Sequence, residues 1–132
     1  MTVVCLHKPE FTSEYIICAH PEDESIIPKF NIISGKTGVI CANDSTSAAL
    51  LLNFKSHKIF VPETVMFAAF DDMKYAAHLY APLTSMQQPA RAIAQSLVGL
   101  LLGRIADQQL APRHILHSGK IIIRESSGIN QN

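Results

Sequence analysis

Two short polar segments, each directly after an apolar run, hold the residues of this 132-residue chain that could do chemistry. Asn43 and Asp44 follow the first run, and Asp71 and Asp72 follow the second, which ends at Phe70. Amides and carboxylates bind the neighbouring hydroxyls of a small ligand through paired hydrogen bonds. The residues alone favour a simpler role for Asn43 or Asp44, a helix cap. A third interpretation is an acid and base pair of Asp44 and Asp71 in a small α/β enzyme.

The apolar runs before these segments predict strands. Gly38 to Ala42 is short and uninterrupted, which is typical of a strand covered on both faces, and Val65 to Phe70 is a second run of strand length. The period then changes to that of a helix from about Ser45 to Ser56, with a stripe at Ala48, Leu51, Leu52 and Lys55. If the two strands are parallel, Asp44 and Asp71 share one rim of the sheet, where α/β proteins bind ligands.

The remaining segments complete the pattern of an α/β domain. They predict strands at Thr2 to Leu6 and Glu14 to Ala19, helical turns from Pro21 to Ile33, turns at Ser34 to Lys36 and Val61 to Thr64, a short helix within Met73 to Tyr80, a helix from Pro89 to about Asp107, and extended chain from His114 to Arg124. The isoleucines Ile121 to Ile123 are expected in the core. The last residues, Ser126 to Asn132, have the composition of a frayed tail.

The helix predicted from Pro89 has the clearest periodicity in the chain, with Pro89 as its first residue. Its apolar stripe consists of Ile93, Leu97, Leu100, Leu101 and Ile105. A stripe of this length must pack on something large.

Composition narrows the classes of function. Eleven basic residues balance eleven acidic ones, so the net charge does not attract nucleic acid or an anionic membrane, and DNA binding would need a separate basic module. The start of the chain lacks the basic segment and apolar core of a secretory signal, and no apolar run reaches about 18 residues. A cytoplasmic protein without a membrane span is therefore expected.

Cysteine and histidine spacing predicts no metal site and no cofactor. The three cysteines, Cys5, Cys18 and Cys41, lie in apolar segments at spacings of neither a disulfide framework nor a zinc site, and are expected to be small core residues. His114 and His117 are close enough to share a helix face, but the residues around them predict extended chain instead.

Six short motifs occur in a fixed order along the chain: Ala42-Asn43-Asp44, Val61-Pro62-Glu63, Phe70-Asp71-Asp72, Pro82-Leu83-Thr84-Ser85, Gln88-Pro89 and Arg124-Glu125-Ser126. Together they resemble the carboxyl-terminal part of LacI/GalR-family transcriptional regulators, over roughly residues 37 to 127. The resemblance implies the second lobe of a type I periplasmic-binding-protein-like effector domain, an α/β fold with a mostly parallel sheet flanked by helices. In such regulators two lobes close around a sugar or other small metabolite, and a separate helix-turn-helix binds operator DNA.

The resemblance also implies a set of ligand-binding residues. Asn43 and Asp44 match the strand-end pair that faces the ligand cleft, and Asp71 matches the acid after an aromatic residue, here Phe70. Gln88 matches a cleft-side residue near the crossover between lobes, although a polar residue before a proline-started helix needs no ligand to explain it. Amides and carboxylates would bind the hydroxyls of a sugar while the aromatic face covers its apolar side.

Residues 1–127 are therefore expected to form part of an effector-binding domain, with 128–132 as a disordered tail and the DNA-binding module absent from this chain. The expected function is to sense a small-molecule effector by lobe closure, without catalysis. The segment after the crossover packs in the first lobe of such regulators, so the helix from Pro89 would either repack on its own sheet or be buried in a partner chain, as in a homodimer. The alternative is a structural or dimerisation domain without a working cleft.

Two positions depart from the family pattern, and one of them is Ala69, which replaces the usual glycine before the aromatic residue and its aspartate. Lys58 stands where these regulators usually have a turn glycine. A left-handed backbone at Lys58 would cost about 1 kcal/mol that glycine avoids. Either the turn differs here or the strain is tolerated.

Overall fold

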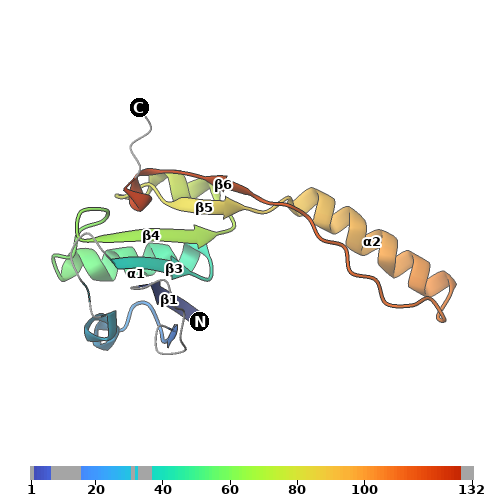
Figure 1. Ribbon diagram of the computed structural model, residues 1–132, viewed down its shortest axis with the longest axis horizontal. Helices are drawn as coiled ribbons and strands as arrows, with labels where there is room; N and C mark the ends of the chain where they lie inside the picture. The colour runs from blue at the N-terminus through green and yellow to red at the C-terminus, as the bar shows by residue number, and fades with distance from the viewer. Residues whose placement is uncertain (1, 7–15, 31, 33–36, 129–132) are drawn as a thin grey trace. The chain divides into compact units, whose positions relative to one another are not determined.

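The computed structural model describes residues 2–6, 16–30, 32 and 37–128 of the chain. The chain divides into two units, one of Met1–Gln87 with Ile121–Asn132 and the other of Gln88–Lys120. The strands form one six-stranded sheet in the order β2-β1-β3-β4-β5-β6 (Figure 1). They are β1 (Thr2–Leu6), β2 (Ile16–Cys18), β3 (Thr37–Cys41), β4 (Val65–Phe70), β5 (Thr84–Gln87) and β6 (Lys120–Ile122).

The centre of the sheet is parallel, because β4 pairs parallel with both β3 and β5. The amino-terminal β1 pairs antiparallel with β2 and with β3. The predicted fold class, an α/β domain with a mostly parallel sheet, is confirmed. The helices within the described residues are α1 (Asp44–Ser56) and α2 (Ala90–Ala106), with the short 3-10 helices η2 (Glu24–Phe30), η3 (Lys74–His78) and η4 (Glu125–Ser127).

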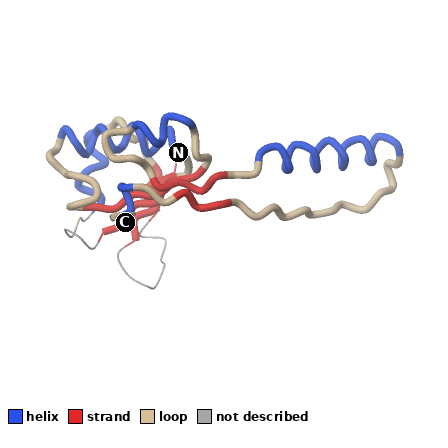
Figure 2. Tube along the Cα trace, turned by 90° about the horizontal axis from the view of Figure 1, so that it is seen from above, coloured by secondary structure: helices blue, strands red, loops and turns tan. Residues whose placement is uncertain are grey.

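The core of the first unit lies between α1 and one face of the sheet. Alternate residues of β3 and β4 are buried, while the residues between them are partly exposed. Most helical residues of this unit lie on one side of the strands (Figure 2). The prediction that Gly38 to Ala42 forms a strand covered on both faces is therefore wrong for the described residues: β3 is buried on its α1 side only.

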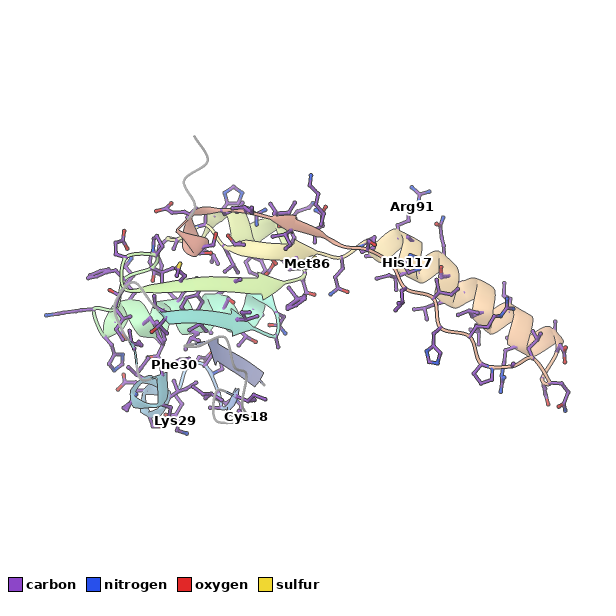
Figure 3. All side chains as sticks on the ribbon, viewed as in Figure 1. Cys18, Lys29, Phe30, Met86, Arg91 and His117 are labelled. Carbon is purple, nitrogen blue, oxygen red and sulfur yellow. The ribbon has the colours of Figure 1, made fainter. Side chains whose placement is uncertain are left out.

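Three aromatic rings fill the centre of this core. Phe54 of α1 stacks edge-on against Phe30 of η2, with ring centroids 5.0 Å apart, and against Phe67 of β4 at 5.3 Å. Figure 3 labels Phe30. The buried stripe of α1 runs through Ser47, Leu50, Leu51 and Phe54. The predicted stripe was shifted by one residue, and Leu52 is 65% exposed. The reason is that Phe54 offers more apolar surface to the core than Lys55.

Helix α1 ends in a Schellman motif, a left-handed turn in which two backbone amides bond back to the last helical carbonyls. Ile59 N–H donates to Phe54 O at 2.9 Å, and Lys58 N–H donates to Lys55 O at 3.0 Å. Lys58 is the left-handed residue, with φ 59°. The strain of a left-handed turn is therefore tolerated here, and this lysine carries the strain that a glycine would avoid.

Two further predictions about burial are wrong. Cys41 is buried as expected, but Cys18 is exposed, because Ile17 is the only residue of β2 that points into the core. The side chain of Cys5 lies outside the described residues. Ile121 and Ile123 are 58% and 37% exposed, since Ile121 lies in β6, the edge strand of the sheet, and Ile123 directly follows that strand.

The segment predicted as a frayed tail is instead ordered up to Gly128. Ser126 is fully buried; its hydroxyl donates to Phe67 O and accepts from Thr84 N–H, both at 2.8 Å. Gly128 closes η4 in a left-handed conformation, with φ 72° and its N–H bonded to Glu125 O at 2.9 Å. These contacts to β4 and β5 could not be read from a polar sequence. Residues 129–132 lie outside the described residues.

The second unit consists of α2 and the chain that follows it. The helix begins at Ala90, with Pro89 as its cap, and none of its residues is buried. Leu97, Leu101 and Ile105 of the predicted stripe are each at least 60% exposed. Within the described residues the stripe thus has no core to pack on. None of the described helices is long and apolar enough to span a membrane.

Candidate functional site

The carboxyl ends of the three parallel strands lie at one edge of the sheet. Asn43 and Asp44 come just after β3, Asp71 comes directly after β4, and β5 ends at Gln87. The predicted common rim of Asp44 and Asp71 is confirmed, because the N–H of Met73, two residues after Asp71, donates to Asp44 Oδ2 at 2.6 Å.

Asn43 is the N-cap of α1. Its Oδ1 accepts hydrogen bonds from Thr46 N–H and from Thr46 Oγ1, both at 2.8 Å. The simpler interpretation of this residue is therefore confirmed. No residue that the structure describes bonds to Asn43 Nδ2, and the side chain is half-buried. The amide nitrogen can thus serve a ligand while the oxygen caps the helix.

Asp44 is fully buried, and both of its carboxylate oxygens are used inside the protein. Ser85 Oγ donates to Oδ1 at 2.6 Å, and Met73 N–H donates to Oδ2 at 2.6 Å. The amino end of α1 adds a favourable dipole for the negative charge. In contrast to the sequence prediction, Asp44 presents no exposed atom to a ligand, because it points under the turn that follows β4.

That turn has an unusual backbone. Asp71 and Asp72 both have positive φ, 109° and 52°. Three successive N–H groups hold the turn in place: Asp71 donates to Met86 O at 3.0 Å, Asp72 donates to Ser85 Oγ at 3.0 Å, and Met73 donates to the buried carboxylate described above. Positive φ in non-glycine residues costs about 1–3 kcal/mol each and persists only where the surroundings enforce it. The backbone of Asp71 is thereby held in one conformation, with the exposed side chain at the rim.

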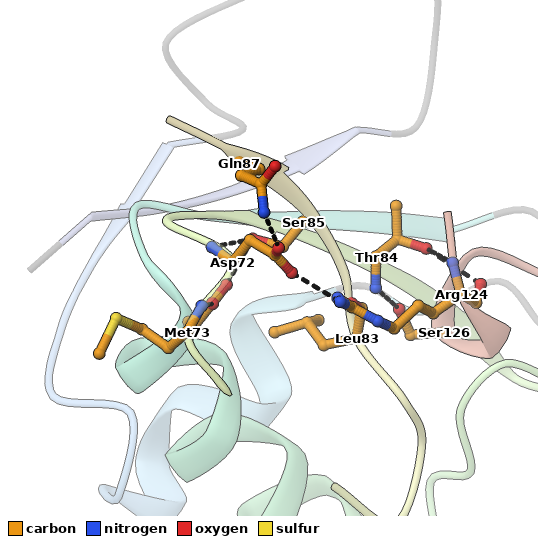
Figure 4. A network of polar contacts seen from close by, with 9 residues as sticks. Asp72, Met73, Leu83, Thr84, Ser85, Gln87, Arg124 and Ser126 are labelled. Atoms are coloured by element: carbon orange, nitrogen blue, oxygen red, sulfur yellow. Dashed lines mark hydrogen bonds and ion pairs between the residues drawn. The ribbon is translucent and has the colours of Figure 1, made fainter. Parts of the chain in front are cut away.

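Asp72 is the centre of a polar network that is partly exposed to solvent (Figure 4). Arg124 Nη2 forms an ion pair with Asp72 Oδ1 at 2.6 Å, and Gln87 Nε2 donates to Asp72 Oδ2 at 2.7 Å. The Arg124 Nη1 group also donates to Leu83 O at 2.7 Å. The network joins the turn after β4 to β5 and to the carboxyl-terminal segment.

Apolar side chains lie exposed around the turn. Phe70, Met73 and Tyr75 are 42%, 50% and 39% exposed. Burial of part of its ring raises the pKa of the Tyr75 hydroxyl, and the negative charges of Asp44 and Asp71 raise the pKa further. A hydrogen bond from the Ser45 side chain acts in the opposite direction. Tyr75 therefore belongs to the same rim as Asp71, although no motif pointed to it.

Gln88, the fifth predicted ligand-binding residue, is exposed and belongs to the second unit. It follows β5 directly, and its role remains a prediction. A cavity of about 510 Å³ in the first unit lies elsewhere, over the outer face of α1. It is lined by Glu22, Glu24, Ala48, Ala49, Leu52, Asn53 and Ser56, none of which was predicted to bind a ligand. The described residues contain no group of three or more His, Cys, Asp or Glu side chains that could hold a metal ion.

Comparison with known families gives a match that covers most of the chain. Residues 11–127 match the model of the periplasmic binding protein-like domain. The chain belongs to this family. Individual relatives of the chain also confirm the predicted resemblance to LacI/GalR-type regulators.

One relative is the HTH-type transcriptional repressor PurR of Vibrio parahaemolyticus, which is 30% identical over 90 residues, 68% of this chain and 27% of the repressor. Among solved structures, a complex of the transcriptional regulator CelR with cellobiose has a TM-score of 0.63 at 29% identity, over 68% of this chain and 28% of that one. A LacI family regulator from Enterococcus faecium with bound ribose has a TM-score of 0.64 at 22% identity, over 79% of this chain and 38% of that one. The chain thus spans about a quarter of the length of its curated relatives.

In this periplasmic binding protein-like domain, the motifs that gave the resemblance meet mainly in the hydrogen-bond network around Asp44 and Asp72. Asp44, Asp72, Ser85, Arg124 and Ser126 come from four of the six motifs, and all five hold the edge together. The motifs therefore mark mainly residues that stabilise this edge of the sheet. Of the predicted ligand-binding residues in the first unit, Asn43, Phe70 and Asp71 are exposed or half-buried.

Sequence reasoning missed the structural roles of Ser85, Asp72 and Arg124. They are 13 to 52 residues from their partners along the chain, so local periodicity carries no signal of the contacts. Their membership of the motifs was the only available indication.

Proposed function

We propose that the carboxyl edge is one wall of a binding site for a polyhydroxylated small molecule, a sugar being the favoured class, in a regulator of the LacI/GalR type. The observation that supports this most directly is the strained turn at Asp71. Asp71 and Asp72 both stand at positive φ, and backbone strain of this kind is concentrated at active sites and ligand-binding sites. The cellobiose and ribose complexes of related regulators support the class of ligand.

In this proposal Asp71 accepts hydrogen bonds from two neighbouring hydroxyls, and Asn43 donates through Nδ2. The half-exposed ring of Phe70 covers the apolar face of the sugar. Asp44 does not touch the ligand but holds the Asp71 turn through Met73 N–H.

The proposed function is binding rather than catalysis. An acid and base pair of Asp44 and Asp71 needs a carboxylate that exchanges protons with a substrate, and both oxygens of Asp44 are buried in hydrogen bonds. Ligand would act by favouring a closed arrangement of two lobes, the other wall being supplied by a first lobe. Operator DNA would be bound by a separate helix-turn-helix module.

A thermal-shift screen tests this proposal. Ribose, glucose, cellobiose, sucrose and a purine base would each be added to the chain, and to the variants Asp71→Asn and Glu63→Gln. Glu63 is an exposed acid in the turn before β4, at the opposite end of that strand, and serves as the matched control. We expect one compound to raise the melting temperature of the chain and of Glu63→Gln by mass action, but not of Asp71→Asn. No shift with any compound, or an equal shift in all three proteins, would contradict the proposal.

A second candidate function, assembly through α2, is favoured by one observation. None of the residues of α2 is buried, although the helix carries five large apolar side chains that are at least 55% exposed: Leu97, Val98, Leu101, Leu102 and Ile105. An apolar surface of this kind normally marks an interface. We propose that it is covered by another protein surface, either the first lobe of the regulator or a second copy in a homodimer.

Mass measurement during size exclusion distinguishes these outcomes. A dimer that becomes monomeric in Leu101→Glu, but not in the exposed control Gln95→Glu, supports the homodimer. A monomer that binds a fluorescent apolar dye at α2 supports coverage of this helix by the first lobe of the regulator. A monomer without dye binding excludes an accessible apolar surface on this helix.

A further inference from the structure

We infer that Asp72 is a positioning residue that ties the Asp71 turn to both chain connections between the two units. The inference rests on the proposed function, because the setting of Asp71 matters for binding only if Asp71 contacts the ligand. Asp72 itself does not contact the ligand in this proposal, but links the rim to the rest of the first unit.

The contacts of Asp72 reach both connections. The chain leaves the first unit after Gln87 and returns to it at Ile121. Gln87, the last residue before the exit, donates to Asp72 Oδ2 at 2.7 Å, and Arg124, three residues after the return, pairs with Asp72 Oδ1 at 2.6 Å. The two oxygens of one carboxylate therefore hold the two connecting segments, one each.

The same residue fixes the backbone of the ligand-facing turn. Asp72 has φ 52° and its N–H donates to Ser85 Oγ at 3.0 Å, while the preceding Asp71 has φ 109°. Asp72 therefore joins the contacts to Gln87 and Arg124 to the positive-φ backbone that sets the position of Asp71. The side chains of Arg124 and Asp72 are only 18% and 9% exposed, so solvent screens the ion pair weakly.

A purely structural salt bridge would predict something different. Its loss would lower the stability of the whole unit and leave the local conformations as they were. The geometry here predicts instead that each connecting segment becomes more mobile when its own contact to Asp72 is removed. Both segments should become more mobile when the Asp72 carboxylate is replaced by an amide.

Amide hydrogen exchange of the full chain tests this pattern. Gln87→Ala is expected to speed exchange at residues 85–88 and not at 121–126. Arg124→Gln, which also loses the bond to Leu83 O, should speed exchange about tenfold at residues 83–84 and 121–126 and not at 86–88, since a lost hydrogen bond to a charged group is worth about tenfold or more in local opening. Asp72→Asn should speed exchange in both segments and at residues 71–73, and leave α1 unchanged. Glu125→Gln, which changes an exposed acid next to Arg124, is the control and should match the unmodified chain.

The three-bond coupling between HN and Hα of Asp71, which reports φ, provides the second measurement. It should change in Asp72→Asn and stay constant in Glu125→Gln. An unchanged coupling in Asp72→Asn, or faster exchange spread evenly over the whole unit, would overturn the inference. Neither measurement uses a ligand. A failed ligand screen would therefore leave this result intact, and failure here would leave the screen intact.

Discussion

The Ser85 hydroxyl lies 2.6 Å from Asp44 Oδ1 and also accepts the N–H of Asp72 at 3.0 Å, so one side chain connects the buried end of α1 to the strained turn. The hydroxyl hydrogen can serve only one acceptor, and the fully buried carboxylate takes it. Removing this group leaves a buried charge with one partner fewer. We expect Ser85→Ala to lower the free energy of unfolding by about 2 kcal/mol, measured by urea titration.

Ser45→Ala provides the comparison for that experiment, because Ser45 is an exposed serine next to the same carboxylate residue. Its effect should stay within about 0.5 kcal/mol. Equal losses in the two variants would mean that the hydrogen bond to Asp44 contributes nothing particular to stability.

Asn43 allows capping and ligand binding to be separated. Asn43→Asp keeps an oxygen that can accept Thr46 N–H but removes the amide donor, whereas Asn43→Ala removes both. Urea titration should show a loss of about 1 kcal/mol for Asn43→Ala and almost none for Asn43→Asp. A compound that stabilises the unmodified chain in the thermal-shift screen should no longer stabilise Asn43→Asp. Unaltered binding by Asn43→Asp would assign this residue to capping alone.

The left-handed Lys58 is a site where stability can be raised. Lys58→Gly relieves a side chain at φ 59° while keeping the two Schellman hydrogen bonds. We expect a gain of about 1 kcal/mol in the free energy of unfolding. Lys55→Gly, three residues earlier inside α1, should instead lose about 1 kcal/mol because glycine disfavours a helix interior. A loss in both variants would show that the left-handed conformation costs nothing here.

Cys41 predicts a dependence of stability on alkaline pH. Burial raises the pKa of its thiol from 9.0 to about 12. The unfolded chain therefore releases this proton at lower pH than the folded chain, so the contribution of Cys41 is intact below pH 9 and is lost as the pH rises from 9 toward about 12. Urea titrations at pH 8 and pH 10 should show a smaller decrease for Cys41→Ala than for the unmodified chain. Identical decreases would remove Cys41 as the cause.

Alkylation of the native chain gives an independent check. Iodoacetamide at pH 8 should label the exposed Cys18 within minutes and label Cys41 only after urea is added, as read by peptide mass spectrometry. Rapid labelling of Cys41 without urea would indicate that β3 opens readily.

Much of the scaffold followed from the order of residues. The apolar run Val65 to Phe70 is the strand β4, and the change of period after Asn43 begins α1. The periodic segment after Pro89 is α2. Each of these signals is local, because an uninterrupted strand or a helical stripe repeats within a few residues. The motifs added the family by their order alone.

Local sequence patterns did not predict which individual side chains are buried. Leu52 and Leu51 are adjacent leucines in one helix, yet only Leu51 enters the core, because Phe54 turns the helix toward Phe30 and Phe67. Ser126 looks like part of a polar tail until Phe67 and Thr84 are placed beside it.

The sequence by itself determined which residue types stand at the strand ends: an amide, an aromatic ring and a group of aspartates. Only the tertiary structure decided what each of them does. Asp44 is drawn inward because Ser85 and the Met73 amide supply the hydrogen bonds that a buried charge requires. Asp71 stays exposed because the same bonds hold its backbone at positive φ. These partners lie 29 and 41 residues from Asp44 along the chain, and no local pattern relates them.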